Sequence, residues 1–242
     1  MRLNSKKIFI CIPTYNEKEN IKKLVKKIFN LTPQLSAGEN LKLVIIDDNS
    51  PDGTGKIADE LAKKYSIKVI HRKRKLGLGS AYIAGFKYAL EKEADFIFEM
   101  DADFSHNPED IPRFLEEAKK GYDLVLGSRK IKYGKIKNWN FWRHFCSNGA
   151  MFFSYLILGL KTKDITTGFR CYKNKVFKKI DLDNIKSNGY AFQEEMIYLC
   201  EKKNFSIKEI PITFIDRKLG KSKLSYKDII EFFIKIIKLK LH

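Results

Sequence analysis

Cysteine is scarce in this chain of 242 residues, and the four that occur form no C-x-x-C pair. Zinc sites and disulfide frameworks need cysteines at short, repeated spacings, so neither is predicted. Reduced thiols are expected, as in a protein of the cytoplasm. The four histidines show no metal-ligand spacing, and no Ser–His or Cys–His arrangement indicates an activated nucleophile. These residues are Cys11, Cys146, Cys171, Cys200, His71, His106, His144 and His242.

Long hydrophobic runs are also missing. The N-terminal stretch MRLNSKKIFICIPTYNE is basic, but its apolar run is only a few residues long, so no signal peptide is predicted. The longest apolar region, Phe145 to Leu160, contains Asn148 and is short for a hydrocarbon layer of about 30 Å. We therefore predict no transmembrane helix.

The glycine-rich phosphate loops of common nucleotide-binding proteins are absent. In KLGLGSAYIAG, the glycines Gly77 and Gly79 are followed by Tyr82 where a dinucleotide fingerprint needs a third glycine. No G-x-x-x-x-G-K-[ST] sequence occurs. Hydride-transfer and P-loop enzymes are therefore excluded. The basic run His71–Lys75 either faces phosphates or forms a solvated charge cluster.

Acidic residues are outnumbered, with 29 Asp and Glu against 47 Lys and Arg, which gives a net charge of +18. Such a surplus predicts an anionic partner: a nucleic acid, an anionic lipid or a phosphorylated small substrate. The alternative is a general lysine enrichment of the source proteome. The chain has none of the usual nucleic-acid-binding modules, so a nucleic-acid partner is not expected.

The first half of the chain alternates apolar strands with amphipathic helices, the pattern of an α/β fold with a mostly parallel sheet. Asn16, followed three residues later by Glu19, predicts a capping box at the first helix. The expected strands are Lys7–Ile12, Leu41–Ile46, Ile67–His71, Asp95–Met100 and Asp123–Leu126. The expected helices are Glu17–Asn30, a segment after SPDGTG to about Tyr65, Ser80–Glu91 and Pro108–Lys120.

The second half is less regular. Asn148–Leu160 is apolar, Ser187–Lys202 is typical of a helix and Phe205–Glu209 of a strand. From Tyr226 a narrow polar stripe and a wide apolar face predict an amphipathic helix, either at a membrane interface or packed on protein. We expect one catalytic domain over residues 1–225, followed by this helix over 226–242.

Polar loops follow the predicted strands at Pro13–Glu17, Asp47–Thr54, Arg72–Gly79 and Asp101–His106. In parallel sheets, ligands bind outside the carboxyl ends of the strands. Asp101 and Asp103 point to the same side of an extended backbone, and such a pair suits Mg²⁺ or Mn²⁺ on a diphosphate. The alternative is a solvated turn that caps the next helix.

At the other acidic strand end, Asp47 and Asp48, one aspartate is expected to bind ligand and the other to organise the SPDG turn. Cations come from the second half of the chain. Arg129 follows a strand, and DRKLGKSKLS contains Arg217 and Lys223. That loop either folds over phosphates or is a basic connector.

Eight sequence blocks resemble, in order, those of family 2 glycosyltransferases of the GT-A fold, and among them the dolichol-phosphate (polyprenol-phosphate) mannose synthases. The resemblance implies a GDP-mannose donor, a divalent metal, and a dolichyl or polyprenyl phosphate acceptor. It also implies a peripheral protein on the cytosolic face of a membrane. The blocks are PTYNEKENI, VIIDDNSPDGTG, GLGSAYIAGF, DADFSHNPEDIP, DLVLGSR, TTGFRCYK, GYAFQEEM and IPITFIDRKLGKSKLS.

The resemblance also implies roles for individual residues. Asp101 and Asp103 correspond to the metal ligands, whereas Ser105 stands where some relatives have a glutamine ligand. The substrate-binding positions are Pro13, Tyr15, Glu17, Ile45, Asp47, Asp101, Ala102, Asp103, Arg129, Arg217 and Lys223. Some relatives carry transmembrane segments near the C-terminus. Here attachment is expected from the tail helix, from Phe145–Leu160 or from small membrane-anchoring subunits.

The expected reaction is direct displacement at the anomeric carbon with inversion. A lipid monophosphate is largely ionised near neutral pH, since its second proton leaves near pH ~6, so it needs no general base. The candidate catalytic residues are Asp103, Arg129 and Gln193. A hydroxyl acceptor would need a carboxylate base, for which Glu194 and Glu195 are the candidates. The rival donors are UDP-sugars, with transfer of glucose or another sugar.

Overall fold

The computed structural model describes residues 6–36, 39–139, 141–185, 187–189, 191–216 and 226–241. Arg217 and Lys223 lie outside these residues. The strands are β1 (Lys6–Thr14), β2 (Glu39–Asp47), β3 (Ile67–His71), β4 (Phe96–Glu99), β5 (Leu124–Ser128), β6 (Lys135–Lys137), β7 (Arg170–Lys173), β8 (Ile207–Pro211) and β9 (Thr213–Ile215). The helices are α1 (Lys18–Phe29), α2 (Thr54–Ala62), α3 (Leu78–Glu91), α4 (Ile111–Lys119), α5 (Phe141–Leu158), α6 (Asn174–Lys179), α7 (Ala191–Lys202) and α8 (Tyr226–Leu241).

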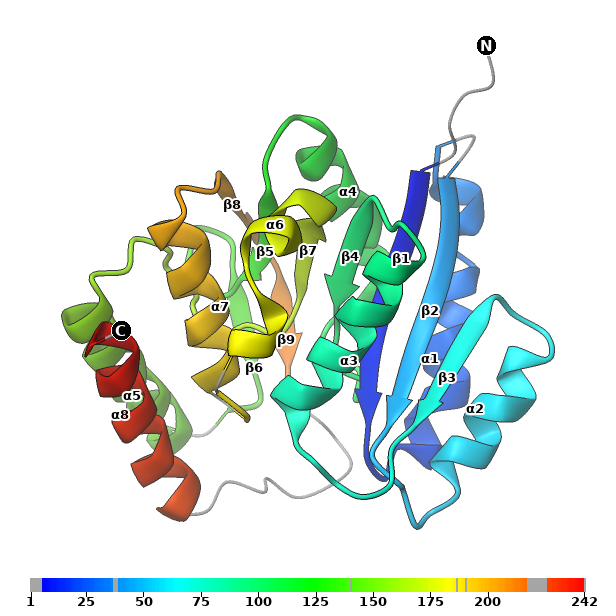
Figure 1. Cartoon of the computed structure of the whole chain (residues 1–242), viewed down its shortest axis with the longest axis horizontal. Coiled ribbons are helices and arrows are strands. Elements are labelled where there is room, and N and C mark those ends of the chain that lie inside the picture. The colour runs from blue at the N-terminus through cyan, green and yellow to red at the C-terminus, as the bar shows by residue number, and fades with distance from the viewer. Residues whose placement is uncertain are drawn as a thin grey trace.

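The central sheet has the strand order β3-β2-β1-β4-β7-β5-β8, and β7 is antiparallel to both of its neighbours (Figure 1). The other pairings in this sheet are parallel. The predicted mostly parallel α/β fold is therefore confirmed. The antiparallel β7 was not predicted, since its short sequence RCYK carries no local signal for strand direction.

Helices cover both faces of the sheet, because successive strand residues point to opposite sides. In β1, Ile8, Ile10 and Ile12 pack with α1, α2 and α4, whereas Phe9 and Cys11 pack with α3, α6 and α7. All five side chains are at most 1% exposed. This is why the strands are apolar at nearly every position rather than at alternate ones.

The predicted capping box at the first helix is wrong. Asn16 has a left-handed φ of 62°, and the N-cap is Glu17, with no side-chain capping bond. Instead, the N–H of Glu17 donates to Thr54 Oγ1 at 2.9 Å and the N–H of Lys18 to Asp52 Oδ2 at 3.1 Å. The helix start is satisfied from the neighbouring turn, a tertiary contact that local spacing does not reveal.

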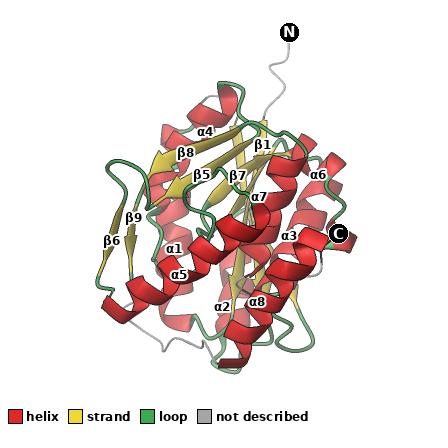
Figure 2. Cartoon of the chain, turned by 90° about the vertical axis from the view of Figure 1, so that its left-hand side faces the viewer, coloured by secondary structure: helices red, strands yellow, loops and turns green. Residues whose placement is uncertain are grey.

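The less regular second half of the chain contributes helices that pack together beside the sheet. Helix α5 begins at Phe141, seven residues before the predicted apolar segment, and α7 begins at Ala191 rather than at Ser187. Helices α5, α7 and α8 share a small buried cluster of Leu158, Ala191, Phe232 and Ile236. Figure 2 looks onto this side of the molecule, where these helices lie in front of the sheet.

Candidate active site

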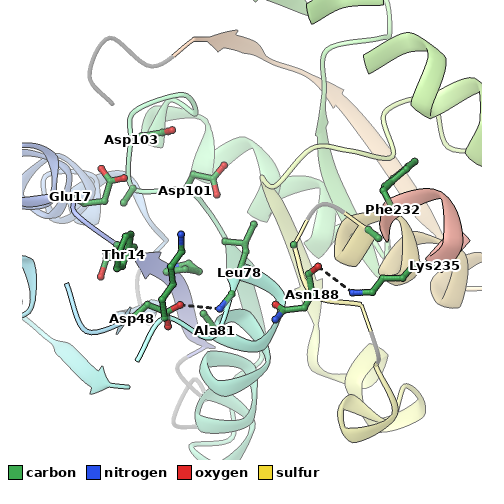
Figure 3. A pocket seen from close by; sticks show the side chains of 17 residues that line it. Thr14, Glu17, Asp48, Leu78, Ala81, Asp101, Asp103, Asn188, Phe232 and Lys235 are labelled. Carbon is green, nitrogen blue, oxygen red and sulfur yellow. Dashed lines mark hydrogen bonds between the residues drawn. The ribbon is translucent and has the colours of Figure 1, made fainter. Parts of the chain in front are cut away.

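A cavity of about 400 Å³ opens at the carboxyl ends of β1, β2 and β4 (Figure 3). Since β2 and β3 lie on one side of β1 and β4 on the other, this is the point where the strand order reverses, and ligands of open α/β sheets bind there. Among the predicted residues, Pro13, Tyr15, Glu17, Asp101, Ala102 and Asp103 line the cavity. The loops after β1 and β4 therefore meet as the sequence predicts.

The side chains of Asp101 and Asp103 both face this cavity (Figure 3). Asp101 Oδ1 accepts a hydrogen bond from the Tyr82 hydroxyl at 3.2 Å, and Asp103 Oδ1 accepts one from the Ser105 N–H at 3.0 Å. In the described part of the chain, no three His, Cys, Asp or Glu side chains gather as a metal site. Two carboxylates beside a cavity with room for a diphosphate nevertheless suit Mg²⁺ or Mn²⁺, which accept phosphate and water as further ligands.

Ser105 and His106 point to the other side of this loop, into a second cavity of about 630 Å³. Both are 2% exposed, and Ser105 Oγ has no hydrogen-bond partner in the described chain. Burial lowers the pKa of His106 to about 4, so the imidazole is neutral. Its ring stacks on Phe169, with 5.2 Å between ring centroids. Ser105 therefore does not replace a glutamine ligand on the side of the first cavity.

Of the pair Asp47 and Asp48, the structure places Asp48 at the cavity, whereas the resemblance implies Asp47. Asp47 Oδ1 accepts from Thr14 Oγ1 at 3.0 Å and from Ser50 Oγ at 2.5 Å, while Oδ2 accepts from the Ser50 N–H at 3.1 Å. Asp47 thus organises the turn. Asp48 lines the cavity.

Asp48 also anchors the loop that leads to α3. Its Oδ1 lies 2.8 Å from Arg72 Nη1, and Oδ2 accepts from the N–H groups of Leu76 and Gly77 at 3.1 and 3.2 Å. Gly77 has a φ of 100°, and a Cβ there would lie 2.5 Å from the Asn188 amide. The KLGLG stretch therefore serves close packing of two loops rather than a dinucleotide.

Ile45 does not reach the cavity. Its side chain is fully buried in the core between the sheet, α1 and α2. Any contact of this residue with a nucleotide would have to come from its backbone, which is already paired within the sheet.

Arg129 lies outside the first cavity's lining, in a cluster of aromatic and charged side chains beyond His106. It is 8% exposed and forms a bidentate ion pair with Asp164. Its guanidinium carbon lies 5.2 Å from the Phe214 ring centroid and 5.7 Å from that of Trp139. Phe214 in turn packs edge-on against His106 at 5.5 Å. The cation is thus one layer of aromatic rings away from the aspartate loop.

Arg143 belongs to the same cluster and was missed from the sequence. Its guanidinium carbon stands 4.5 Å above the Trp139 ring, and Nη1 lies 2.6 Å from Asp216 Oδ2. The segment around it, NWNFWRHFCSN, matches no motif, so nothing local distinguishes this arginine. Its position beside Arg129 is a result of the way α5 packs.

Gln193 is 5% exposed and lies beneath the aspartate loop. Its Nε2 donates to Glu99 Oε2 at 3.1 Å. A Cβ at Gly168 would lie 3.4 Å from Asp101 Oδ2 and 3.5 Å from Gln193 Nε2, so both side chains lie close to this glycine. Gln193 is thus paired with the buried Glu99 and lies near Asp101.

Glu194 and Glu195 are both buried and do not line the cavity. Glu195 Oε2 accepts from the Ser187 N–H at 2.8 Å. Neither oxygen of Glu194 has a hydrogen-bond partner in the described chain, and burial raises its pKa to about 8. Neither carboxylate is placed to take a proton from an acceptor in the cavity.

Helix α8 contributes Phe232 and Lys235 to the cavity wall, which the sequence did not predict (Figure 3). Lys235 Nζ donates to the Asn188 backbone oxygen at 3.5 Å. Lys75 is a further unpredicted lining residue, with its Nζ 4.6 Å from the centroid of the Tyr15 ring. Of these three residues, only Lys75 lies in a segment that the sequence singled out, the basic run His71–Lys75.

Solved structures with the same fold include glucosyl-3-phosphoglycerate synthase from Mycobacterium tuberculosis. Its complex with Mn²⁺, UDP and glucosyl-3-phosphoglycerate matches with a TM-score of 0.67 at 14% identity, over 98% of this chain and 79% of that chain. Its complex with Mn²⁺ and UDP-glucose matches with a TM-score of 0.66. These likenesses show a GT-A-like fold.

Sequence relatives are much closer. The chain is 41% identical over 234 residues to the polyprenol monophosphomannose synthase of Mycolicibacterium smegmatis, covering 96% of this chain and 86% of the relative. It is 42% identical over 220 residues to the undecaprenyl-phosphate mannosyltransferase of Micrococcus luteus, covering 90% and 88%. It is 39% identical to the dolichol-phosphate mannosyltransferase of Pyrococcus furiosus, over 96% of this chain and 63% of that protein.

The sequence profile described as glycosyl transferase family 2 matches residues 9–184. This span contains β1 to β7 and the cavity's two acidic loops. The chain belongs to glycosyl transferase family 2.

Proposed function

We propose that this protein transfers mannose from GDP-mannose to dolichyl or polyprenyl phosphate and forms polyprenyl phosphate mannose with inversion at the anomeric carbon. One observation carries the proposal: relatives about 40% identical over nearly the whole chain, from three different sources, are named mannosyltransferases of a polyprenol, undecaprenyl or dolichol phosphate. The acidic cavity at the strand ends supports it, because a nucleotide diphosphate with its metal suits such a site.

In this proposal, the loop after β1 binds the nucleotide through Pro13, Tyr15 and Glu17, which line the cavity. Asp101 and Asp103 hold Mg²⁺ or Mn²⁺, and the metal supplies charge stabilisation for the departing diphosphate. Ala102 between them is 4% exposed and packs in the core, which fixes the loop. Ile45, Asp47, Arg217 and Lys223 remain predictions for donor binding. Of these, Asp47 is the weakest, since Asp48 takes the cavity position.

The acceptor phosphate is proposed to approach from the Arg129 side of the aspartate loop. A phosphate monoester is already an anion near neutral pH, so cations that position it are needed and a base is not. Glu194 and Glu195, the candidates for a base toward a hydroxyl acceptor, are buried and do not line the cavity, which agrees with this. Gln193 is proposed to steady Asp101 through its contacts beneath the loop.

The membrane-facing surface is proposed to be formed by α5 and α8. On α5, Phe141, Phe145, Phe152 and Leu156 are 61 to 82% exposed and recur at spacings that share one helix face. On α8, Ile234, Ile237 and Leu241 are 46 to 77% exposed, with Lys238 and Lys240 exposed beside them. Exposed apolar side chains edged by lysines suit an anionic lipid surface.

None of the helices that the structure describes is long and apolar enough to cross a membrane. On the exposed apolar faces of α5 and α8, we propose a peripheral location on the cytosolic face of a membrane, with small anchoring subunits as partners. The predicted division at residue 225 stays a prediction. Phe232 and Lys235 of α8 line the cavity, so the helix contributes to the site as well as to the surface.

A donor screen tests the proposed function. The purified chain is incubated with Mn²⁺ or Mg²⁺, undecaprenyl or dolichyl phosphate in detergent, and either GDP-mannose or UDP-glucose, and the lipid products are identified by mass spectrometry. We expect polyprenyl phosphate mannose from GDP-mannose. Exclusive transfer from UDP-glucose would support the rival polyprenyl-phosphate glucosyltransferase. A salt-dependent nucleic-acid shift without sugar transfer would support the nucleic-acid-binding alternative.

A vesicle experiment tests the membrane surface. Sedimentation with anionic vesicles is compared between the wild type and a double variant, Phe145→Ser with Phe152→Ser, whose side chains are 61% and 69% exposed. We expect the variant to bind vesicles at least about tenfold more weakly, since an aromatic side chain contributes roughly 1.5 to 3 kcal/mol when it is fully buried, here in the lipid. Tyr133→Ser, at 73% exposure but outside both helices, is the matched control. Equal loss in the control would argue against this surface.

A further inference from the structure

Arg129 is bound by a single carboxylate, that of Asp164, through both its backbone and its side chain. Its backbone N–H donates to Asp164 Oδ2 at 2.7 Å, Nε donates to the same oxygen at 2.8 Å, and Nη2 donates to Oδ1 at 2.7 Å. Nη2 also donates to Thr166 Oγ1 at 2.5 Å. The fork of the guanidinium thus matches the fork of the carboxylate, and this is the strongest geometry such a pair can adopt.

Asp164 is itself fixed before any ligand binds. It is fully buried, and its N–H donates to Glu209 Oε1 at 3.0 Å while the N–H of Lys163 donates to Glu209 Oε2 at 2.9 Å. A few residues earlier, Glu201 on α7 accepts from the N–H groups of Lys161 and Thr162. Two carboxylates, one on β8 and one on α7, therefore anchor the loop that carries Asp164.

The charge state of the pair is also fixed. Burial by itself would raise the pKa of Asp164, but the hydrogen bonds and charge of Arg129 outweigh burial and hold this pKa below its ordinary value. Asp164 is therefore ionised wherever the enzyme is folded near neutral pH. Since it occupies Nε and Nη2, the remaining edge of the guanidinium, Nη1, is directed away from it.

Aromatic rings connect the guanidinium of Arg129 to the aspartate loop. The guanidinium rests against Phe214 and Trp139, and Phe214 contacts His106, whose Nδ1 lies 3.7 Å from Asp101 Oδ2. An anion that reaches the free edge of this guanidinium meets a cation that needs no reorientation. Fixed charges of this kind stabilise developing charge better than mobile ones.

We propose that Asp164 is a positioning residue, which acts only through Arg129 and aims its guanidinium at the phosphate of the acceptor. The proposal rests on the proposed function, since it assigns the phosphate near Arg129 to the acceptor. Asp164 itself does not touch the substrate. A merely structural role would give a loss that is independent of Arg129.

The test measures binding without turnover. Calorimetry with a short-chain prenyl phosphate gives the dissociation constant for the wild type, Asp164→Asn, Arg129→Ala and the double variant. We expect each single variant to bind about tenfold more weakly, a change of about 1.4 kcal/mol. The double variant should bind no more weakly than Arg129→Ala alone, since Asp164 has nothing left to position. A further tenfold loss in the double variant would overturn the proposal.

Steady-state kinetics separates the acceptor from the donor. Asp164→Asn should lower kcat and raise KM for the lipid phosphate, while KM for the sugar nucleotide stays within about twofold. An equal rise in the donor KM would contradict the positioning role. If the wild type binds prenyl phosphate with the expected pattern of variants but transfers no mannose, the proposed function fails and the positioning role stands.

Two further variants guard against loss of folding. Removing half of a buried ion pair is strongly destabilising, so Asp164→Asn must be measured below its unfolding temperature. Thr166→Val removes one hydrogen bond to Nη2 without a charge and should weaken prenyl phosphate binding in the same direction by a smaller factor. Glu201→Gln, in the same loop anchor but without contact to Arg129, should leave binding unchanged. Unchanged binding in Thr166→Val and a loss in Glu201→Gln would together overturn the proposal.

Discussion

Two strand ends of this protein carry adjacent acidic residues, and they serve different purposes. After β2, Asp47 closes the turn with Thr14 and Ser50, and Asp48 pairs with Arg72 at the edge of the cavity. After β4, Asp101 and Asp103 are turned toward the cavity. The comparison shows that two acidic strand ends of similar sequence can differ, because the aspartates after β2 fix the turn and the loop before α3, whereas both aspartates after β4 face the cavity.

The largest difference between the two ends should appear on removing a carboxylate from each. Asp103→Ala is expected to reduce mannosyl transfer by about 100-fold or more, because a metal on the diphosphate loses one of its two protein ligands. Its unfolding temperature should stay close to that of the wild type. The measurement is transfer rate together with Mn²⁺ binding by calorimetry. Full activity with unchanged Mn²⁺ affinity would sink the metal assignment.

Asp48→Ala should lower the free energy of unfolding much more than Asp103→Ala does. It leaves Arg72, whose side chain is 8% exposed, without its buried partner, so we expect a loss of about 3 to 5 kcal/mol in the free energy of unfolding. Urea denaturation measures this loss. Asp59→Ala, which removes a half-exposed partner of His71, is the control and should cost less than about 1 kcal/mol. Equal stability of Asp48→Ala and its control would contradict the structural role.

Gly77→Ala tests whether the loop that Asp48 anchors also shapes the cavity. A side chain at φ 100° is strained, and its Cβ would meet the Asn188 amide at 2.5 Å. We expect a loss of stability of about 1 to 3 kcal/mol and a several-fold rise in the KM for the sugar nucleotide, because Gly77 lines the cavity. Gly121→Ala, also at positive φ but with open space around it, separates backbone strain from the clash. A donor KM that rises equally in both variants would contradict the loop's role.

Glu194 extends the comparison to a carboxyl group without any hydrogen-bond partner in the described chain. Its pKa is raised to about 8 in the folded protein, so the folded state binds more protons than the unfolded state between pH 4.5 and 8. Stability should therefore fall as pH rises through this range. In Glu194→Gln the fall should be flatter, as measured by the unfolding temperature at several pH values. An unchanged or steeper fall in the variant would refute the buried, protonated state.

Much of the fold was available from the sequence because the strands are covered on both faces. The five strands expected in the first half are present, with ends that differ by a few residues. The missing elements are β6, β7 and β9 and the short helix α6. They are three to six residues long, and such short segments have too few positions to show a period.

The candidate site was predicted where it lies on loops that follow apolar strands. Pro13, Tyr15, Glu17, Asp101 and Asp103 are at the cavity because parallel strands end at one edge of the sheet. Phe232, Lys235 and Asn188 come from segments distant in the chain, and no local pattern could bring them there. Arg129 was predicted from the sequence because it follows a strand. Its partner Asp164 was recognised only from their contact in the structure.

The sequence by itself determined the α/β class, the family and the aspartate pair of the proposed metal site, because these depend on periodicity and on the order of short motifs. Tertiary structure decided that Asp47 is bound within its own turn, whereas Asp101 and Asp103 face the cavity. It also decided that Arg129 is aimed by Asp164 and that Glu194 is shut away from the cavity. The reason is physical: a charged side chain's role is set by the donors, acceptors and burial around it, and these come from residues far away in the chain.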